Sequence, residues 1–177
     1  GPFTTLNANA SFSYYDQLEM ETPTILGTRF QRQSAGSDVI ARFGSIGPIS
    51  SGALGGRASW ESFGFGGSLY TPNSERLNLG VFTYQEIDLD PVRLEAGIRY
   101  DWTQTTPERE DRNSDIGHVR RRTFASLSGS VGLLYNWEPG FVMGANVSRA
   151  FRTPDVHELF SEGPHLAAYS FDVGNPD

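Results

Sequence analysis

The sequence predicts an all-β protein, an antiparallel up-and-down meander of about seven strands that forms part of a transmembrane β-barrel. Three features support this prediction. Apolar and polar side chains alternate with a period of two, as they do on the two faces of a strand. The alternating runs are longer than strands of soluble sandwiches usually are. Short and long connections alternate between the runs, as they do in outer-membrane barrels.

The composition suits many strands joined by turns. The chain has 177 residues, of which 20 are glycine and 12% are aromatic, and 37% are hydrophobic. It contains no cysteine, which excludes disulfides, thiolate metal sites and cysteine nucleophiles. Its net charge of -7 argues against general nucleic-acid binding, which needs a basic surface. No apolar run approaches the roughly 18 residues of a transmembrane helix.

The first four predicted strands cover 6–15, 28–43, 53–63 and 76–88. One face of the first strand is apolar, through Leu6, Ala8, Ala10, Phe12 and Tyr14. Ile40 interrupts the alternation of the second. The third alternates Leu54, Ala58 and Trp60 with Arg57, Ser59 and Glu61. The fourth is the least regular, because large apolar side chains fall on both of its faces, namely Leu77, Leu79, Val81, Phe82 and Tyr84.

The last three predicted strands cover 92–102, 123–137 and 141–151. The strand at 92–102 is the clearest, because its apolar residues alternate without a break with the residues of a face that carries Arg93, Glu95, Arg99 and Asp101. The other two place apolar residues opposite serine, asparagine and glycine. The charged face would line a wet lumen in a membrane barrel and would meet solvent in a soluble sandwich, so this pattern alone leaves both open.

Strand length favours the membrane barrel. A run of about 11 residues at roughly 3.3 Å each, tilted by about 45°, covers ~25 Å, the height of the apolar band of an outer-membrane barrel. The connections agree with this reading. Those at 45–51, 88–91 and 138–140 are short, whereas those at 21–26, 65–75, 103–122 and from 152 onward are mostly longer. Aromatic side chains gather near strand ends, which is typical of an interfacial girdle and also of ordinary strand preference.

The stretch 154–160 predicts one helical turn after the last strand. Pro154 has no N–H for a strand ladder and suits the first helical position, Thr153 is a candidate N-cap, and Gly163 with Pro164 ends the turn. Asp155 and Glu158 form a carboxylate pair, for which helix capping is favoured over acid–base chemistry. No catalytic motif is present, so we do not expect an enzyme.

This region resembles a segment of the TonB-dependent outer-membrane receptors, R-x-P-x-x-x-E-L-[FY]-x-x-G-P-H-x-A. The matching residues are Arg152, Pro154, Glu158, Leu159, Phe160, Gly163, Pro164, His165 and Ala167. The stretch from Phe171 to Pro176 resembles the F-x-x-G-[ND]-P that follows it in the family. The resemblance implies that the chain supplies about seven strands of a larger barrel, of about 22 strands, with a plug domain in its lumen. We therefore expect residues 1–177 to be a single partial β-barrel domain, with the plug domain, the signal peptide and the last strands absent.

The resemblance also implies a function and a location. It implies TonB-energised uptake of a scarce nutrient, such as a metal, a siderophore or haem, across the outer membrane of a Gram-negative bacterium. The implied partners are outer-membrane lipid and lipopolysaccharide, the TonB complex through the missing N-terminal part, and a small nutrient ligand, without nucleic acid. No resident cofactor is expected; zinc, an iron chelate or haem would be cargo. The alternatives are a passive porin-like channel and a soluble β-sandwich or barrel that acts as a binding module.

Two groups of side chains are candidate sites. His118, His157 and His165 are candidate metal ligands, because imidazoles near carboxylates suit zinc. The alternative is that His165 holds a loop by hydrogen bonds and that His118 is solvated. Arg120, Arg121 and Arg122 are candidates for binding lipopolysaccharide phosphates, since guanidinium groups bind phosphate through two hydrogen bonds. The alternative is that they are solvated bases of a loop.

Overall fold

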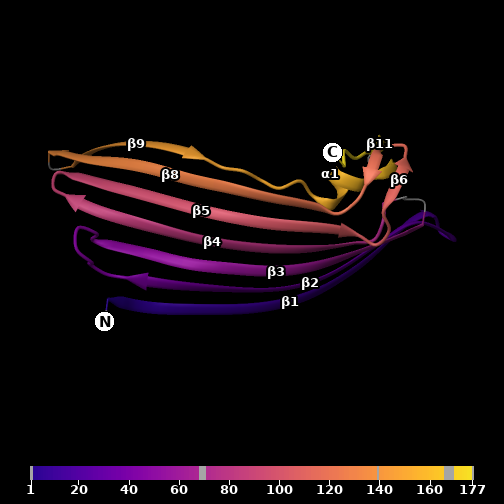
Figure 1. Ribbon diagram of the computed structural model, residues 1–177, viewed down its shortest axis with the longest axis horizontal. Helices are drawn as coiled ribbons and strands as arrows, with labels where there is room; N and C mark the ends of the chain where they lie inside the picture. Colours follow the sequence, from indigo (N-terminus) through magenta and orange to yellow (C-terminus); the bar gives the residue numbers. More distant parts are fainter. Residues whose placement is uncertain (1, 68–70, 139, 166–169, 177) are drawn as a thin grey trace.

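A computed structural model describes residues 2–67, 71–138, 140–165 and 170–176, with the backbone alone for Glu21, Glu138, Pro164 and His165. Seven strands form one antiparallel sheet in the order β1-β2-β3-β4-β5-β8-β9 (Figure 1). Their bounds are β1 Phe3–Thr22, β2 Ile25–Phe43, β3 Ser51–Gly67, β4 Ser74–Leu89, β5 Val92–Pro107, β8 Arg122–Glu138 and β9 Phe141–Arg149. The predicted all-β meander is confirmed. Among the described residues the sheet is open, with β1 and β9 outermost, as in part of a barrel.

The curved sheet has two faces of opposite character. Its convex face exposes apolar side chains along the strands, among them Leu79, Val81, Ile98, Leu127 and Val131. Its concave face is polar along the middle of the strands, because the register aligns polar residues in rows there, whereas Phe82 and Tyr84 lie on it nearer the end of β4 that turns into β5. One such row joins Asp38 to Arg57, Arg57 to Gly80, Gly80 to Asp101 and Asp101 to Ser126.

The connections lie at two ends of the sheet. Those between β2 and β3, β4 and β5, and β8 and β9 share one end, at the left of Figure 1. At the other end, the predicted longer stretch 21–26 is instead a tight turn, because β1 and β2 continue to Thr22 and Ile25. The Thr22 hydroxyl oxygen accepts the backbone N–H of Ile25 at 3.1 Å and so closes this turn. We call this second end the far end of the sheet.

Most of the predicted connection 103–122 is also strand. β5 runs on to Pro107, and a small hairpin follows, with β6 at Asp111–Ser114 and β7 at Gly117–Val119. The extension of β5 beyond Trp102 contains three threonines, and β-branched residues favour strands. The connection therefore adds structure at the far end of the sheet.

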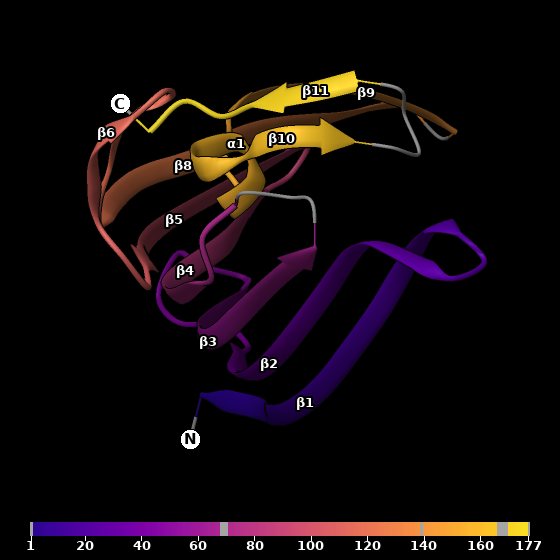
Figure 2. The ribbon, with the colours of Figure 1, turned by 90° about the vertical axis from the view of Figure 1, so that its right-hand side faces the viewer.

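After β9 the chain leaves the sheet and folds into its concave side. β9 has nine residues, and its pairing with β8 ends at Arg149 and Gly129. The helix α1 (Val156–Phe160) and the hairpin of β10 (Glu162–His165) and β11 (Ser170–Val173) follow (Figure 2). No helix among the described residues is long and apolar enough to cross a membrane.

The buried core of the described residues lies under α1. Val156, Leu159 and Phe160 of α1 cluster with Val119 of β7, and the partly buried Phe63, Phe65, Ile116 and Phe124 pack against them. Burying a large apolar side chain contributes roughly 1.5–3 kcal/mol. The core therefore holds the segment after β9 against the concave face.

Candidate functional site

Arg76 of β4 anchors the segment that follows β9. Its side chain is buried on the concave face, at 9% exposure for the residue. Its Nη2 donates hydrogen bonds to the Thr153 hydroxyl at 2.7 Å and to the Pro154 carbonyl at 3.0 Å, and its Nη1 lies 3.9 Å from an oxygen of Asp155. One wall residue thus holds three consecutive residues of the segment. Sequence reasoning missed this role, because its partners lie 77 and 78 residues further on.

The N-terminus of α1 is capped by Asp155 rather than by Thr153 as predicted. The Asp155 carboxylate accepts the backbone N–H of Val156, and the Glu158 carboxylate accepts the backbone N–H of Asp155 at 2.7 Å. This reciprocal arrangement is a capping box, which satisfies donors that the helix leaves open. The Thr153 hydroxyl is instead bonded to Arg76. The two carboxylates act in capping, as the sequence favoured.

Glu158 has a second partner within the same segment. Arg152 donates two hydrogen bonds to its carboxylate, at 2.9 and 2.6 Å, so that two matching residues of the family segment form an ion pair. These bonds from Arg152, together with the N–H of Asp155, lower the pKa of Glu158 to about 2. The carboxylate therefore stays charged over the physiological pH range.

The tail after β11 closes the other end of α1. The N–H of Gly174 donates to the Ser161 carbonyl at 2.6 Å, and that of Asn175 donates to the Glu158 carbonyl at 2.8 Å. A Cβ on Gly174 would lie 2.8 Å from backbone atoms of Leu159 and Phe160, so only glycine fits this approach. Gly163 has a φ of 155°, within the range that favours glycine. The glycines of the two family patterns are thus explained by backbone geometry.

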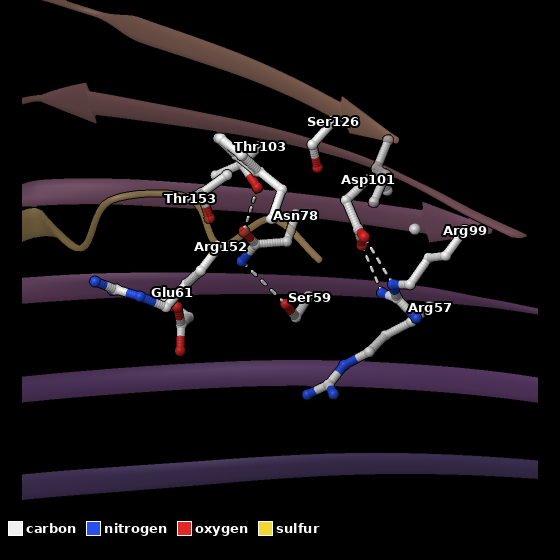
Figure 3. Close-up of a pocket in the computed structure, with 13 residues that line it drawn as sticks. Arg57, Ser59, Glu61, Asn78, Arg99, Asp101, Thr103, Ser126, Arg152 and Thr153 are labelled. Carbon is white, nitrogen blue, oxygen red and sulfur yellow. Dashed lines mark hydrogen bonds and ion pairs between the residues drawn. The ribbon is translucent and has the colours of Figure 1, made fainter. Parts of the chain in front are cut away.

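Two clefts lie on the concave face beside this segment. The mid-wall cleft, of about 380 Å³, is bordered by β3, β4, β5 and residues 151–153 (Figure 3). Its floor is a hydrogen-bonded row, in which Thr103 donates to Asn78 at 2.9 Å and Asn78 donates to Ser59 at 3.2 Å. Arg99 and Asp101 pair beside this row at 2.5 Å. This cleft is polar. Arg99 and Asp101 neutralise each other within the wall, whereas Arg57 has no bonded partner among the described residues.

The second cleft, which we call the rim cleft, lies toward the far end of the sheet, between α1 and strands β1–β3. It has a volume of about 690 Å³, and its lining includes Tyr15, Gln17, Glu19, Phe30, Arg32, Phe63, Phe65, Asp155 and His157. The His157 ring meets the Phe65 ring edge-on at 5.0 Å between centroids. The Arg32 guanidinium lies over the Phe63 ring, 5.4 Å from its centroid. The rim cleft is therefore much more aromatic than the mid-wall cleft.

The two predicted histidine ligands whose side chains are described, His118 and His157, have different surroundings. Nδ1 of His157 is 3.1 Å from the Ser161 hydroxyl, and its ring packs against Phe65. Nε2 of His118, in β7, is buried without a hydrogen-bond partner among the described residues. The side chains of His165 and Pro164 lie outside the described residues, as does Ala167. In the described part of the chain, no group of three or more His, Cys, Asp or Glu could hold a metal ion. The histidine metal site stays a prediction.

The three predicted phosphate-binding arginines also differ in position. Arg122 lies over the Phe124 ring, 5.9 Å from its centroid, and donates a hydrogen bond to the Pro176 carbonyl of the tail. Because Phe124 packs against the core under α1, Arg122 belongs to the concave side. Arg120 and Arg121 are exposed just before β8. Their binding of lipopolysaccharide stays a prediction.

The open meander, its apolar convex face and its polar concave face define a partial β-barrel whose wall carries a folded-in segment. The whole chain, residues 1–177, matches the family model for the TonB dependent receptor-like β-barrel. The chain belongs to this family of outer-membrane receptors. A search among curated proteins finds no match.

Proposed function

We propose that this chain forms part of the wall of a receptor that takes up a small nutrient ligand across the outer membrane of a Gram-negative bacterium, driven by the TonB complex. The observation that supports the proposal is the two-faced sheet with a segment anchored on its concave side. The convex face, with exposed Leu79, Val81 and Val131, suits contact with lipid. The polar concave face suits a wet lumen through which a ligand passes.

Within this function, the family segment has a positioning role. Arg76 and the tail hold Arg152, Pro154, Glu158 and Phe160 in one compact unit. That unit forms one side of both clefts. We propose that the ligand contacts the clefts and that the family segment shapes them. A metal or a metal chelate would be cargo in transit, and no resident metal is needed for this role.

Growth of a deletion strain tests the proposal. The strain lacks the gene and receives iron, zinc or haem as its sole and limiting source of that nutrient. We expect poor growth on one source, restoration by a plasmid copy, and loss of that restoration in cells without TonB. Restoration that does not need TonB would indicate a passive channel. Equal growth of the deletion and parent strains on every source would contradict uptake of these nutrients.

A further inference from the structure

The concave face changes character toward the far end of the sheet, where the rim cleft lies. Along the middle of the strands, its rows carry Arg, Asp, Asn, Ser and Thr. Nearer the far end, two rows are different. In one, the register joins Tyr15 to Arg32 and Arg32 to Phe63, and in the next it joins Gln17 to Phe30 and Phe30 to Phe65. Aromatic side chains thus gather at this end of a face whose middle rows are polar. Packing under α1 accounts for some of these rings.

Two of the rings do not contact the buried cluster itself. Phe63 and Phe65 pack against the buried cluster of α1, so their presence is explained. Tyr15 and Phe30 lie outside that cluster. Tyr15 remains 51% exposed, whereas Phe30 is half-buried and its ring lies 6.2 Å from the rings of both Phe65 and His157. Aromatic surface turned toward water is unfavourable, and an exposed apolar patch inside a cleft is typical of a binding site. Tyr15, and the part of the Phe30 ring that these contacts leave open, line the rim cleft and can contact a ligand.

The rings are held in place before any ligand arrives. Phe30 meets Phe65 edge-on at 6.2 Å between centroids, and Phe65 meets His157 edge-on at 5.0 Å. The Tyr15 hydroxyl donates to the side-chain carbonyl of Gln17, whose amide donates to Glu19 at 3.3 Å. Because these contacts restrict the side chains, little rotamer freedom remains to be lost on binding.

We propose that the rim cleft binds a flat, conjugated ring system of the ligand, stacked against Tyr15 and Phe30 and facing His157 of α1. The proposal rests on the proposed uptake function and names the chemical class of its ligand. The volume of about 690 Å³ is typical of small-molecule sites, which span roughly 300–1,000 Å³. Polar side chains of Glu19, Arg32 and Asp155 line the same cleft, with Arg32 over the Phe63 ring, and would orient the ligand beside Tyr15 and Phe30.

Binding by the purified receptor in detergent micelles tests the inference with three probes. Metal-free protoporphyrin supplies a conjugated ring without a metal, a ferric catecholate supplies aromatic rings with iron, and a ring-free ferric hydroxamate supplies iron alone. The variants Tyr15→Leu and Phe30→Leu remove a ring and keep apolar bulk. The matched control is Tyr14→Leu, because Tyr14 is the neighbour on β1 that points to the other face of the sheet.

We expect at least one ring-bearing probe to bind, and each of the two cleft variants to weaken it about 2- to 10-fold, the loss of one aromatic contact. Tyr14→Leu should bind as the parent does. The inference is overturned if neither ring-bearing probe binds, if the hydroxamate binds as tightly as they do, or if all three variants weaken binding equally. A TonB-dependent growth defect without ring binding would overturn this inference alone. Ring binding without any growth defect would count against the uptake function instead.

Discussion

Replacing Arg76 with alanine should release the segment after β9 from the wall. The substitution removes two hydrogen bonds from a charged donor, at 2.7 Å to Thr153 and at 3.0 Å to the Pro154 carbonyl. Each bond of this kind contributes roughly 1.5–3 kcal/mol, and neighbouring contributions are not additive. We therefore expect the attached state to lose about 3 kcal/mol. At about 1.4 kcal/mol per factor of ten, this loss shifts the attachment equilibrium roughly 100-fold.

Amide hydrogen exchange of the protein in detergent micelles measures this shift. The N–H groups of Leu159 and Ser161, bonded within α1 at 3.0 Å each, should exchange about 100-fold faster, while amides between β4 and β5 keep their protection. Arg57→Ala is the matched control, because Arg57 is an exposed arginine of the same face whose side chain has no bonded partner among the described residues. The reasoning is refuted if α1 stays protected in Arg76→Ala, or if Arg57→Ala loosens it equally.

Three further predictions follow from the folded-in segment and the convex face. Because the pKa of Glu158 is lowered to about 2 from its usual 4.5, its charge stabilises the segment fully above pH 4.5, and this contribution is lost as the pH falls through about 2. The NMR titration of the Glu158 carboxyl group should have a midpoint near 2, which rises in Arg152→Ala, and a midpoint near 4.5 in the parent would contradict this. Gly174→Ala should destabilise the attachment of the tail by about 1–3 kcal/mol, since its Cβ would meet backbone at 2.8 Å; unchanged exchange of the tail amides would argue against that contact. Val131→Arg should lower the free energy of unfolding, measured with urea in lipid vesicles, by about 2–4 kcal/mol, because this side chain is 62% exposed on the convex face. Ser130→Arg, on the concave face, should be tolerated, and equal losses of stability in the two variants would contradict the assignment of the faces.

The sequence predicts the strands well and their ends less well. The alternation in 92–102 is visible without a partner strand, because each residue's face follows from its position alone. The extension of β5 to Pro107 depends on pairing with β4, where Pro107 lies opposite Ser74. In the same way, β1 ends at Thr22 and β2 begins at Ile25, because these two residues pair with each other across a tight turn. Strand ends are set by partners that local periodicity does not reveal.

The sequence likewise predicts the local structure of the candidate site but not its long-range contacts. The motif from Arg152 to His165 predicts a helical turn, and α1 is found there. The N-cap is Asp155 rather than Thr153, because α1 begins at Val156, and the Thr153 hydroxyl is bonded to Arg76. Arg76 carries no local signal that would have revealed this contact. The rim cleft likewise needs β1, β2, β3 and α1 together, so the gathering of its rings follows from strand register rather than from any motif.

The sequence by itself determined the all-β class, the meander, the family resemblance and the short helix, because period-two alternation and proline and glycine chemistry act over a few residues. It left open whether the polar face of each strand meets solvent or lines a lumen. The tertiary structure decided that the strands form one open curved sheet, whose concave side receives the segment after β9. It also decided that the family segment is held by Arg76 and Gly174. Those contacts join residues far apart in the chain, and only the folded register brings them within hydrogen-bonding distance.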